Sequence, residues 1–187
     1  MSSDSLKIVN FALKMKIVLI GYMGSGKSSV GKALAKELNV PFHDLDDEIE
    51  KKEQSEISKI FESRGEIYFR KTENNTLKTL LSKPDDFVLA TGGGTPCYGD
   101  SLPAILNADN TLSVYLKTPI HILSERLFPE RKQRPLVAHL DSIEKMNEFI
   151  GIHLFERSHF YNQANITIDA GEDSPETLAM KIKQSLL

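Results

Sequence analysis

Several features that would indicate other classes of protein are absent from this sequence. Cys97 is the single cysteine, so no disulfide can form within the chain, which fits a reducing compartment. The formal net charge of −3 lacks the basic excess of nucleic-acid-binding proteins. No apolar run approaches the length of a membrane span, and residues 1–14 lack the apolar core and cleavage site of a secretory signal. We expect a cytoplasmic protein with no nucleic-acid or membrane partner. We also expect residues 1–14 to be a peripheral leader, with Met15 as an alternative start.

The clearest motif is KIVLIGYMGSGKS, residues 16–28. Its apolar beginning predicts a buried strand, and residues 21–28 match G-x-x-x-x-G-K-[ST] at every fixed position. Glycines let such a loop turn its backbone N–H groups towards a polyphosphate, and the helix that follows adds the positive end of its dipole. Lys27 supplies a cation for the outer phosphates, and the Ser28 hydroxyl can ligate Mg²⁺. The residues expected to hold a nucleotide are Gly24, Ser25, Gly26, Lys27, Ser28 and Ser29.

Strand patterns alternate with helical patterns along the chain, which is typical of a parallel sheet covered by helices. The expected strands are residues 16–20, 41–44, 87–91, 111–116 and 166–169. The expected helices are residues 27–38, a segment opened by 46–48, 56–63, 66–81, 120–127, one that runs from a capping box at 141–144 to 162, and one that starts at 174–175. Ser55 is an expected N-cap, Gly65 an expected helix end and 128–135 an expected loop. We predict one α/β domain, residues 1–187, with a five-stranded parallel sheet and helices on both faces.

Three of the expected strands end in residues that can do chemistry, and ligands of open parallel sheets bind beyond these carboxyl ends. They are followed by the Gly21 loop, by Asp44 and Asp46, and by the glycines 92–94. In an extended segment Asp44 and Asp46 face the same way, so one could hold Mg²⁺ through water and the other could accept a proton. The alternative is acidic decoration of a helix start. The glycines indicate either a close approach of backbone to a ligand or a flexible turn.

Other chemically capable residues carry no pattern of their own. Taken alone, Arg70, Arg134 and Arg157 fit solvated surface positions better than a site. The five histidines show no metal-ligand spacing, and no His or Asp pattern makes Cys97 a nucleophile.

Six segments, in this order, resemble those of the shikimate kinase family. They are GYMGSGKS at 21–28, FHDLDDEIE at 42–50, GEIYFRKTE at 65–73, LATGGGT at 89–95, RPL at 134–136 and ERSHFY at 156–161. They resemble the family's phosphate loop, its F-x-D-x-D-x-x-I-E segment, its G-E-x-x-F-R-x-x-E helix, its glycine-triplet strand end, the R-P-L of its lid and its E-R-x-x-x-Y helix. The resemblance extends from Ile17 to about Pro175, and this ordered combination is much more specific than a phosphate loop alone.

The resemblance implies a three-layer P-loop kinase sandwich with a mobile lid. It also implies the transfer of a phosphoryl group from ATP to shikimate, giving shikimate 3-phosphate and ADP in aromatic amino-acid biosynthesis. Lys27, Asp46 and Arg134 would be catalytic, with Asp46 as the base. Ser28 and Asp44 would lie at Mg²⁺.

The resemblance further implies two binding regions, at about 44–72 for the substrate and about 128–140 for the lid, in a protein that acts as a monomer. The implied substrate-binding residues are Asp46, Arg70, Gly92, Gly93, Gly94 and Arg157. The two arginines suit a carboxylate because their donors form a fork. Beyond the loop, the implied ATP-binding residues are Arg126, Arg134, Ser174 and Pro175, with Leu127 as a competitor in register for Arg126.

One departure from the family pattern is Pro96, which stands where we expect an aliphatic residue. Another small-molecule P-loop kinase, acting on a sugar acid or a nucleoside monophosphate, is the nearest alternative function. A GTPase-type switch would require an N-K-x-D motif, which the sequence lacks. A catalytically silent binding module is disfavoured because Lys27, Asp46 and Arg134 are all retained.

Overall fold

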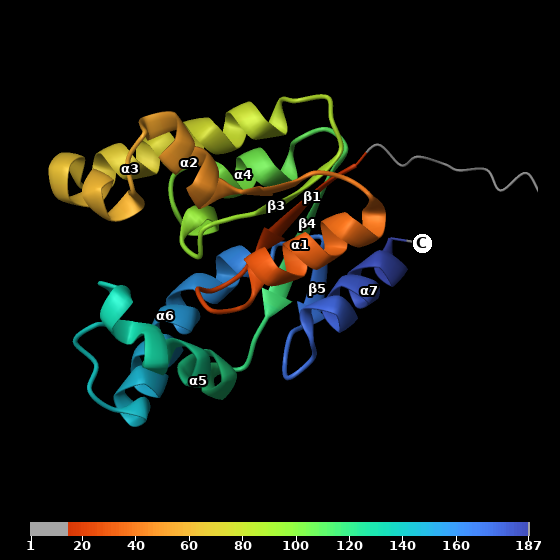
Figure 1. Cartoon of the computed structure of the whole chain (residues 1–187). Coiled ribbons are helices and arrows are strands. Elements are labelled where there is room, and N and C mark those ends of the chain that lie inside the picture. The colour runs from red at the N-terminus through yellow and green to blue at the C-terminus, as the bar shows by residue number, and fades with distance from the viewer. Residues whose placement is uncertain (1–14, 187) are drawn as a thin grey trace, which may run out of the picture.

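A central parallel sheet organises the chain. The structure is a computed structural model that describes residues 15–186, so the expected leader 1–14 lies outside the described residues. The strands are β1 (Lys16–Ile20), β2 (Phe42–Asp44), β3 (Phe87–Ala90), β4 (Thr111–Lys117) and β5 (Ile166–Asp169). Their spatial order is β2-β3-β1-β4-β5, and every neighbouring pair is parallel (Figure 1). The predicted five-stranded parallel sheet is confirmed.

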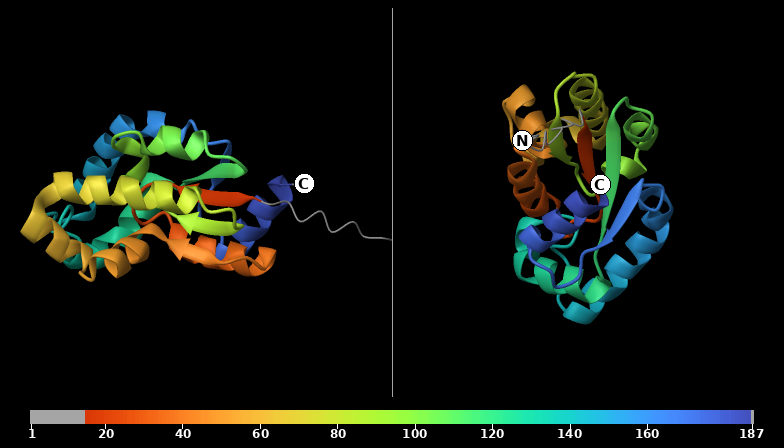
Figure 2. Two further views of the ribbon diagram at one scale, coloured as in Figure 1. Left: turned by 90° about the horizontal axis from the view of Figure 1, so that it is seen from above. Right: turned by 90° about the vertical axis from the view of Figure 1, so that its right-hand side faces the viewer.

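Helices cover both faces of this sheet. They are α1 (Lys27–Leu38), α2 (Leu45–Glu53), α3 (Ile57–Leu81), α4 (Ser101–Leu106), α5 (Ile120–Glu130), α6 (Ile143–Tyr161) and α7 (Pro175–Ser185). Alternate residues of β1 point to opposite faces: Ile17 and Leu19 pack with α1 and α7, and Val18 and Ile20 pack with α3 and α4. Figure 2 (left) shows the strands between α4 on one side and α1 on the other. This is the predicted α/β layer architecture.

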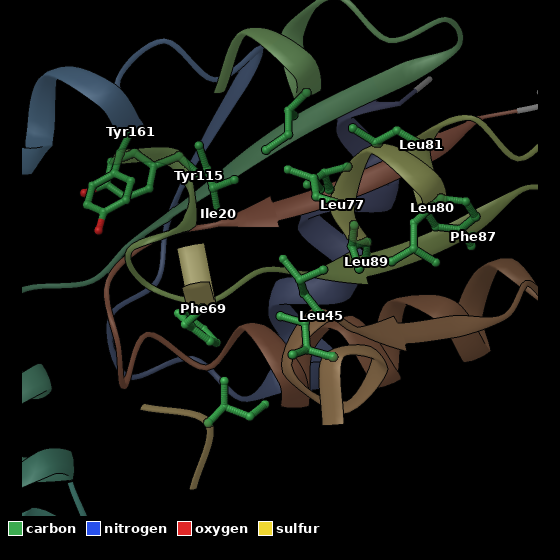
Figure 3. Close-up of a cluster of buried hydrophobic side chains, with 14 residues drawn as sticks. Ile20, Leu45, Phe69, Leu77, Leu80, Leu81, Phe87, Leu89, Tyr115 and Tyr161 are labelled. Atoms are coloured by element: carbon green, nitrogen blue, oxygen red, sulfur yellow. The ribbon is translucent and has the colours of Figure 1, made fainter. Parts of the chain in front are cut away.

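The core on the α3 face fixes the position of α3. Leu77 of α3 and Leu89 of β3 are fully buried in this core, together with Phe87 (Figure 3). Full burial of one such side chain stabilises the fold by about 1.5–3 kcal/mol. Because the C-terminal half of α3 is anchored in this way, Phe69 and the neighbouring Arg70 are held at the carboxyl edge of the sheet.

Some predicted helix boundaries are wrong and others are confirmed. Glu56, not Ser55, is the N-cap of α3, and its side chain makes no capping hydrogen bond. Gly65 does interrupt the helix, because its φ of 80° and ψ of 172° are not helical. This conformation is strained for residues with a Cβ atom, which explains the glycine.

The region around α5 and α6 also departs from prediction. Residues 128–135 are not all loop: α5 continues to Glu130, and Arg131–Gln133 form a 3₁₀ turn. Ser142, not Asp141, caps α6 and accepts a hydrogen bond from the Lys145 backbone N–H. The short helix α4 was not predicted. By contrast, Ser174 caps α7 with Pro175 in its first turn, as predicted.

Candidate active site

A cleft lies at the carboxyl ends of β1, β2 and β3, which are neighbours in the sheet. Its volume is about 380 Å³. The lining residues are Met23, Gly24, Gly26, Lys27, Ser28, Ser29, Asp44, Asp46, Thr91, Gly92, Gly93, Arg126, Leu127, Glu130 and Arg134. The three strand ends that the sequence singled out therefore open into one cleft.

The phosphate-binding loop connects β1 to α1. Gly24 and Gly26 have φ values of 79° and 91°, which residues with a Cβ atom rarely adopt. Lys27 is buried, and its ammonium donates to the carbonyls of Gly21 (2.9 Å) and Tyr22 (2.8 Å). Burial lowers the pKa of Lys27 to about 8, and the negative charges of Asp46 and Asp44 limit this fall. Lys27 therefore remains mostly protonated and positively charged at neutral pH.

Ser28 and Asp44 meet at the rim of the loop. The Ser28 hydroxyl donates to Asp44 Oδ2 at 2.6 Å, and Asp44 Oδ1 accepts from the Asp46 backbone N–H at 3.1 Å. Asp44 thereby caps α2, so Asp46 lies in the first helical turn and not in the extended segment we expected. Both carboxylates nevertheless line the cleft. A hydroxyl and a carboxylate are oxygen donors of the kind that Mg²⁺ prefers.

Asp46 lies in surroundings that disfavour its negative charge. Burial raises its pKa from 3.8 to about 6, and the negative charges of Asp44 and Glu73 add to the rise. Lys27 acts in the opposite direction. A carboxylate with a pKa near 6 is ionised at neutral pH and can still accept a proton efficiently.

Close packing, not an unusual backbone angle, explains the glycine triplet. None of the three has a positive φ. A Cβ atom on Gly93 would lie 2.7 Å from the backbone N of Met23, and one on Gly94 would lie 3.1 Å from Arg70 Nη2. The triplet is therefore closely packed between the phosphate-binding loop and Arg70, and its approach to a ligand stays a prediction.

Arg70 lies beside the triplet, outside the residues that line the cleft itself. Its Nη1 donates to Glu73 Oε2 at 2.8 Å, and its guanidinium lies over the Tyr98 ring at 3.9 Å from the centroid. Glu73 is 1% exposed and also accepts from Thr95 Oγ1 at 2.7 Å. The negative charge of Glu73 raises the pKa of Arg70, against the effect of burial.

Arg157 approaches the same place from α6. It is half-buried, and its charge opposes the burial-driven rise in the pKa of Tyr22, Cys97 and Tyr161. The Tyr161 hydroxyl donates to the Gly93 carbonyl at 2.6 Å. The two arginines that the sequence could not separate from surface positions thus both lie near Cys97, which follows the triplet.

Of the other residues predicted to bind the nucleotide, Arg126 and Arg134 line the cleft, whereas Ser174 and Pro175 do not. Arg126 lines the cleft and donates to the carbonyls of Gly24 (3.2 Å) and Gly171 (3.3 Å), whereas its neighbour Leu127 is buried. Arg134 lines the cleft, and its Nη2 pairs with Glu130 at 2.8 Å.

Ser174 and Pro175 do not line the cleft. The Ser174 hydroxyl accepts the capping hydrogen bond of α7.

Sequence reasoning missed several residues that shape this site. Glu73 occurs within a motif and Glu130 within an expected loop, both without an assigned role, and Tyr98 belongs to no motif. Glu73 could have been found because a carboxylate three residues after an arginine on a helix lies beside it. Pro96 lies in the first turn of the 3₁₀ helix Thr95–Cys97, where its missing N–H breaks no helical hydrogen bond.

The fold and the cleft define a P-loop phosphotransferase: a parallel α/β sheet, a phosphate-binding loop with a buried lysine, and an acidic group across the cleft. The sequence model described as "Shikimate kinase" matches residues 23–187. The chain belongs to the shikimate kinase family.

Individual relatives agree with the family match. The chain is 48% identical to the shikimate kinase of Flavobacterium johnsoniae over 149 residues, covering 80% of this chain and 86% of the relative. It is 39% identical to that of Flavobacterium psychrophilum over 171 residues, covering 91% and 98%.

Solved structures give the same result. The shikimate kinase of Acinetobacter baumannii in complex with shikimate superposes with a TM-score of 0.81 at 35% identity, covering 92% of both chains. That of Bacteroides thetaiotaomicron gives 0.82 at 34% identity, covering 92% and 98%.

Proposed function

We propose that this chain transfers the γ-phosphoryl group of ATP to the 3-hydroxyl of shikimate, giving shikimate 3-phosphate and ADP in aromatic amino-acid biosynthesis. The observation that carries the proposal is that Lys27, Asp46 and two glycines of the triplet, Gly92 and Gly93, line one cleft. Arg70 lies beside Gly94, and in this proposal its guanidinium binds the substrate carboxylate. The relative from Acinetobacter baumannii has shikimate bound, which supports the same substrate here.

In this proposal the phosphate-binding loop holds the triphosphate. The Lys27 ammonium exchanges the carbonyls of Gly21 and Tyr22 for phosphate oxygens when ATP enters. Arg134 leaves Glu130 and stabilises the negative charge that develops on the transferred group. The ion pair that it gives up is half-exposed and costs little to break, on the order of 0.2–1 kcal/mol.

The ring acid would be held on the opposite side of the cleft. Arg70 and Arg157 offer fork-shaped donors to its carboxylate, and Gly92–Gly94 offer backbone N–H groups to the ring. Asp46 binds the reacting hydroxyl and accepts its proton, which its pKa of about 6 permits. Positioning and charge stabilisation then supply most of the rate, because phosphoryl transfer needs little covalent help from the protein.

Mg²⁺ fits the oxygen donors present. Ser28 and Asp44 would hold the ion, and the ion would neutralise charge on the phosphates. No group of three or more His, Cys, Asp or Glu side chains that could hold a metal occurs in residues 15–186. Such a metal would therefore take most of its ligands from phosphate and water.

Arg126 would contact the adenine, because it bridges the phosphate-binding loop and the Gly171 carbonyl. Ser174 and Pro175 would approach the nucleotide from the next turn.

Residues of about 44–72 would form the substrate-binding region, and residues of about 128–140 would form a lid, both within one domain of residues 1–187. Val137 and Leu140 are buried against Met146, so they would anchor the end of the lid while Arg134 moves. Hydrogen exchange at 128–136 that ignores added ATP and shikimate would count against the lid.

We also propose that the enzyme acts as a cytoplasmic monomer, as the resemblance to the shikimate kinase family implies. Within residues 15–186 the structure contains no helix that is long and apolar enough to cross a membrane. Size-exclusion chromatography with light scattering tests the monomer.

The experiment that tests the function is an ADP-release assay with purified protein, ATP and Mg²⁺. Shikimate, quinate, gluconate and nucleoside monophosphates serve as acceptors. We expect turnover with shikimate and identification of shikimate 3-phosphate by mass spectrometry. In the same assay Arg70→Ala and Arg157→Ala should weaken shikimate binding while ATP affinity, measured by calorimetry, survives. Turnover with another acceptor and none with shikimate would overturn the proposal.

A further inference from the structure

Tyr22 of the phosphate-binding loop makes a long-range contact that the proposed mechanism does not use. Its side chain is 1% exposed, and its hydroxyl lies 3.2 Å from Nδ1 of His153 on α6. The two residues are 131 positions apart in the chain. A buried tyrosine hydroxyl needs a hydrogen-bond partner, and in residues 15–186 His153 is the partner recorded for Tyr22.

The direction of this hydrogen bond follows from the surroundings of both groups. Burial raises the pKa of Tyr22, so its hydroxyl stays protonated. Burial and the charge of Arg157 lower the pKa of His153, so its ring is neutral at physiological pH. We assign the proton to Tyr22 and the lone pair to His153 Nδ1, because the reverse arrangement leaves a buried O–H without an acceptor.

His153 lies on the same face of α6 as Arg157. His153, Arg157 and Tyr161 are spaced i, i+4 and i+8, so they lie on one face of the helix. One turn before Arg157, His153 is hydrogen-bonded to Tyr22 of the phosphate-binding loop. One turn after Arg157, Tyr161 is hydrogen-bonded to the Gly93 carbonyl. Arg157 therefore lies between two residues of the same helix face that are both hydrogen-bonded to other parts of the protein.

We propose that the Tyr22–His153 hydrogen bond is a positioning contact, which holds the turn of α6 that carries Arg157 at a fixed place relative to the phosphate-binding loop. The inference rests on the proposed function, in which Arg157 binds the substrate carboxylate. Neither Tyr22 nor His153 needs to touch the substrate. Their loss should displace Arg157 and therefore weaken shikimate binding, with little effect on the transfer step.

The test is a double-mutant cycle with steady-state kinetics. Tyr22→Phe keeps the ring and removes only the hydroxyl, and His153→Leu removes the acceptor. Each should raise the KM for shikimate about three- to tenfold, equivalent to about 0.7–1.4 kcal/mol, and change kcat and the KM for ATP less than twofold. Because each single change removes the same bond, the double variant should be no worse than either single variant.

Two further variants separate positioning from general stability. His153→Gln retains an acceptor oxygen and should recover part of the shikimate affinity. His159→Leu changes an exposed histidine on the same helix and should leave the KM for shikimate unchanged. A purely structural role would lower the Tm of the variants without moving this KM. If His153→Leu does not fold, Tyr22→Phe and His153→Gln still carry the test.

The outcomes are distinguishable. Wild-type protein that does not phosphorylate shikimate overturns the proposed function and this inference with it. Wild-type turnover with an unchanged shikimate KM in Tyr22→Phe and His153→Leu overturns the inference alone. So does a double variant whose defect equals the product of the two single defects, because independent defects do not arise from one shared bond.

Discussion

Replacing Asp46 by asparagine should make the protein more stable and nearly inactive. The Asp46 carboxylate is mostly buried near Asp44 and Glu73, and no hydrogen bond to its side-chain oxygens is recorded within residues 15–186. Asparagine has nearly the same shape and carries no charge. The substitution therefore removes an unfavourable charge and gives up little in contacts.

The size of the effect follows from the pKa of Asp46, which rises from 3.8 to about 6 on folding. The native state holds this proton more tightly than the unfolded chain does. The stability contributed by the protonated group is therefore complete below pH 3.8 and is lost as the pH rises through 6. At about 1.4 kcal/mol per unit, the loss is about 3 kcal/mol at pH 7.5 and about half of that at pH 5.

The assay is urea unfolding of wild type and Asp46→Asn at pH 7.5 and pH 5. We expect the variant to have a free energy of unfolding about 2–3 kcal/mol higher at pH 7.5, or a Tm higher by about 4–10 °C, with a smaller gain at pH 5. Its kcat should fall about 10²–10⁴-fold, because the general base is gone. Asp47→Asn, an exposed neighbour in the same helical turn, should change stability by no more than about 0.5 kcal/mol at either pH.

Three results would refute this reasoning. A destabilised Asp46→Asn would mean that the carboxylate makes favourable contacts. A gain in the free energy of unfolding that is larger at pH 5 than at pH 7.5 would mean that folding does not raise the pKa of Asp46. Near-normal kcat would remove Asp46 from the chemistry while leaving the stability argument intact.

Two other substitutions test separate parts of the cleft. Arg134→Ala should lower kcat about 10³-fold or more, with little change in the KM for shikimate. The control Lys132→Ala, which changes an exposed residue of the same segment, should leave kcat unchanged. Comparable kcat values for the two variants would contradict a transition-state role for Arg134. Gly93→Ala places a Cβ 2.7 Å from the Met23 backbone N, so it should weaken both ATP and shikimate binding in calorimetry. In the control Gly151→Ala, the new Cβ meets only the end of the Ile120 side chain, at 3.8 Å. This variant should raise the Tm slightly, because alanine is the better helix former. Unchanged affinities in Gly93→Ala would show that the loop and the triplet can separate without cost.

The fold was largely predictable because its signals are local. The alternation of strand and helix patterns, and the glycines and lysine of the phosphate-binding loop, depend on residues that are close in sequence. The errors in helix N-caps occurred where neighbouring residues compete for one role, as Ser55 with Glu56 and Asp141 with Ser142 do. The functional roles of the site residues stay predictions until the variants are measured.

Local sequence patterns were sufficient to predict the strands of the parallel sheet, the loop beside Lys27 and the three strand ends that open into the cleft. Each of these features is specified by a short stretch of residues, although the order of the strands in the sheet is not. Which side chains contact one another became evident from the packing of the folded chain. Folding packed Glu73 against Arg70 and Thr95, pressed Gly93 against Met23, and joined Tyr22 to His153 across 131 positions. Such contacts depend on how layers of helices pack on a sheet, and no local spacing records that packing.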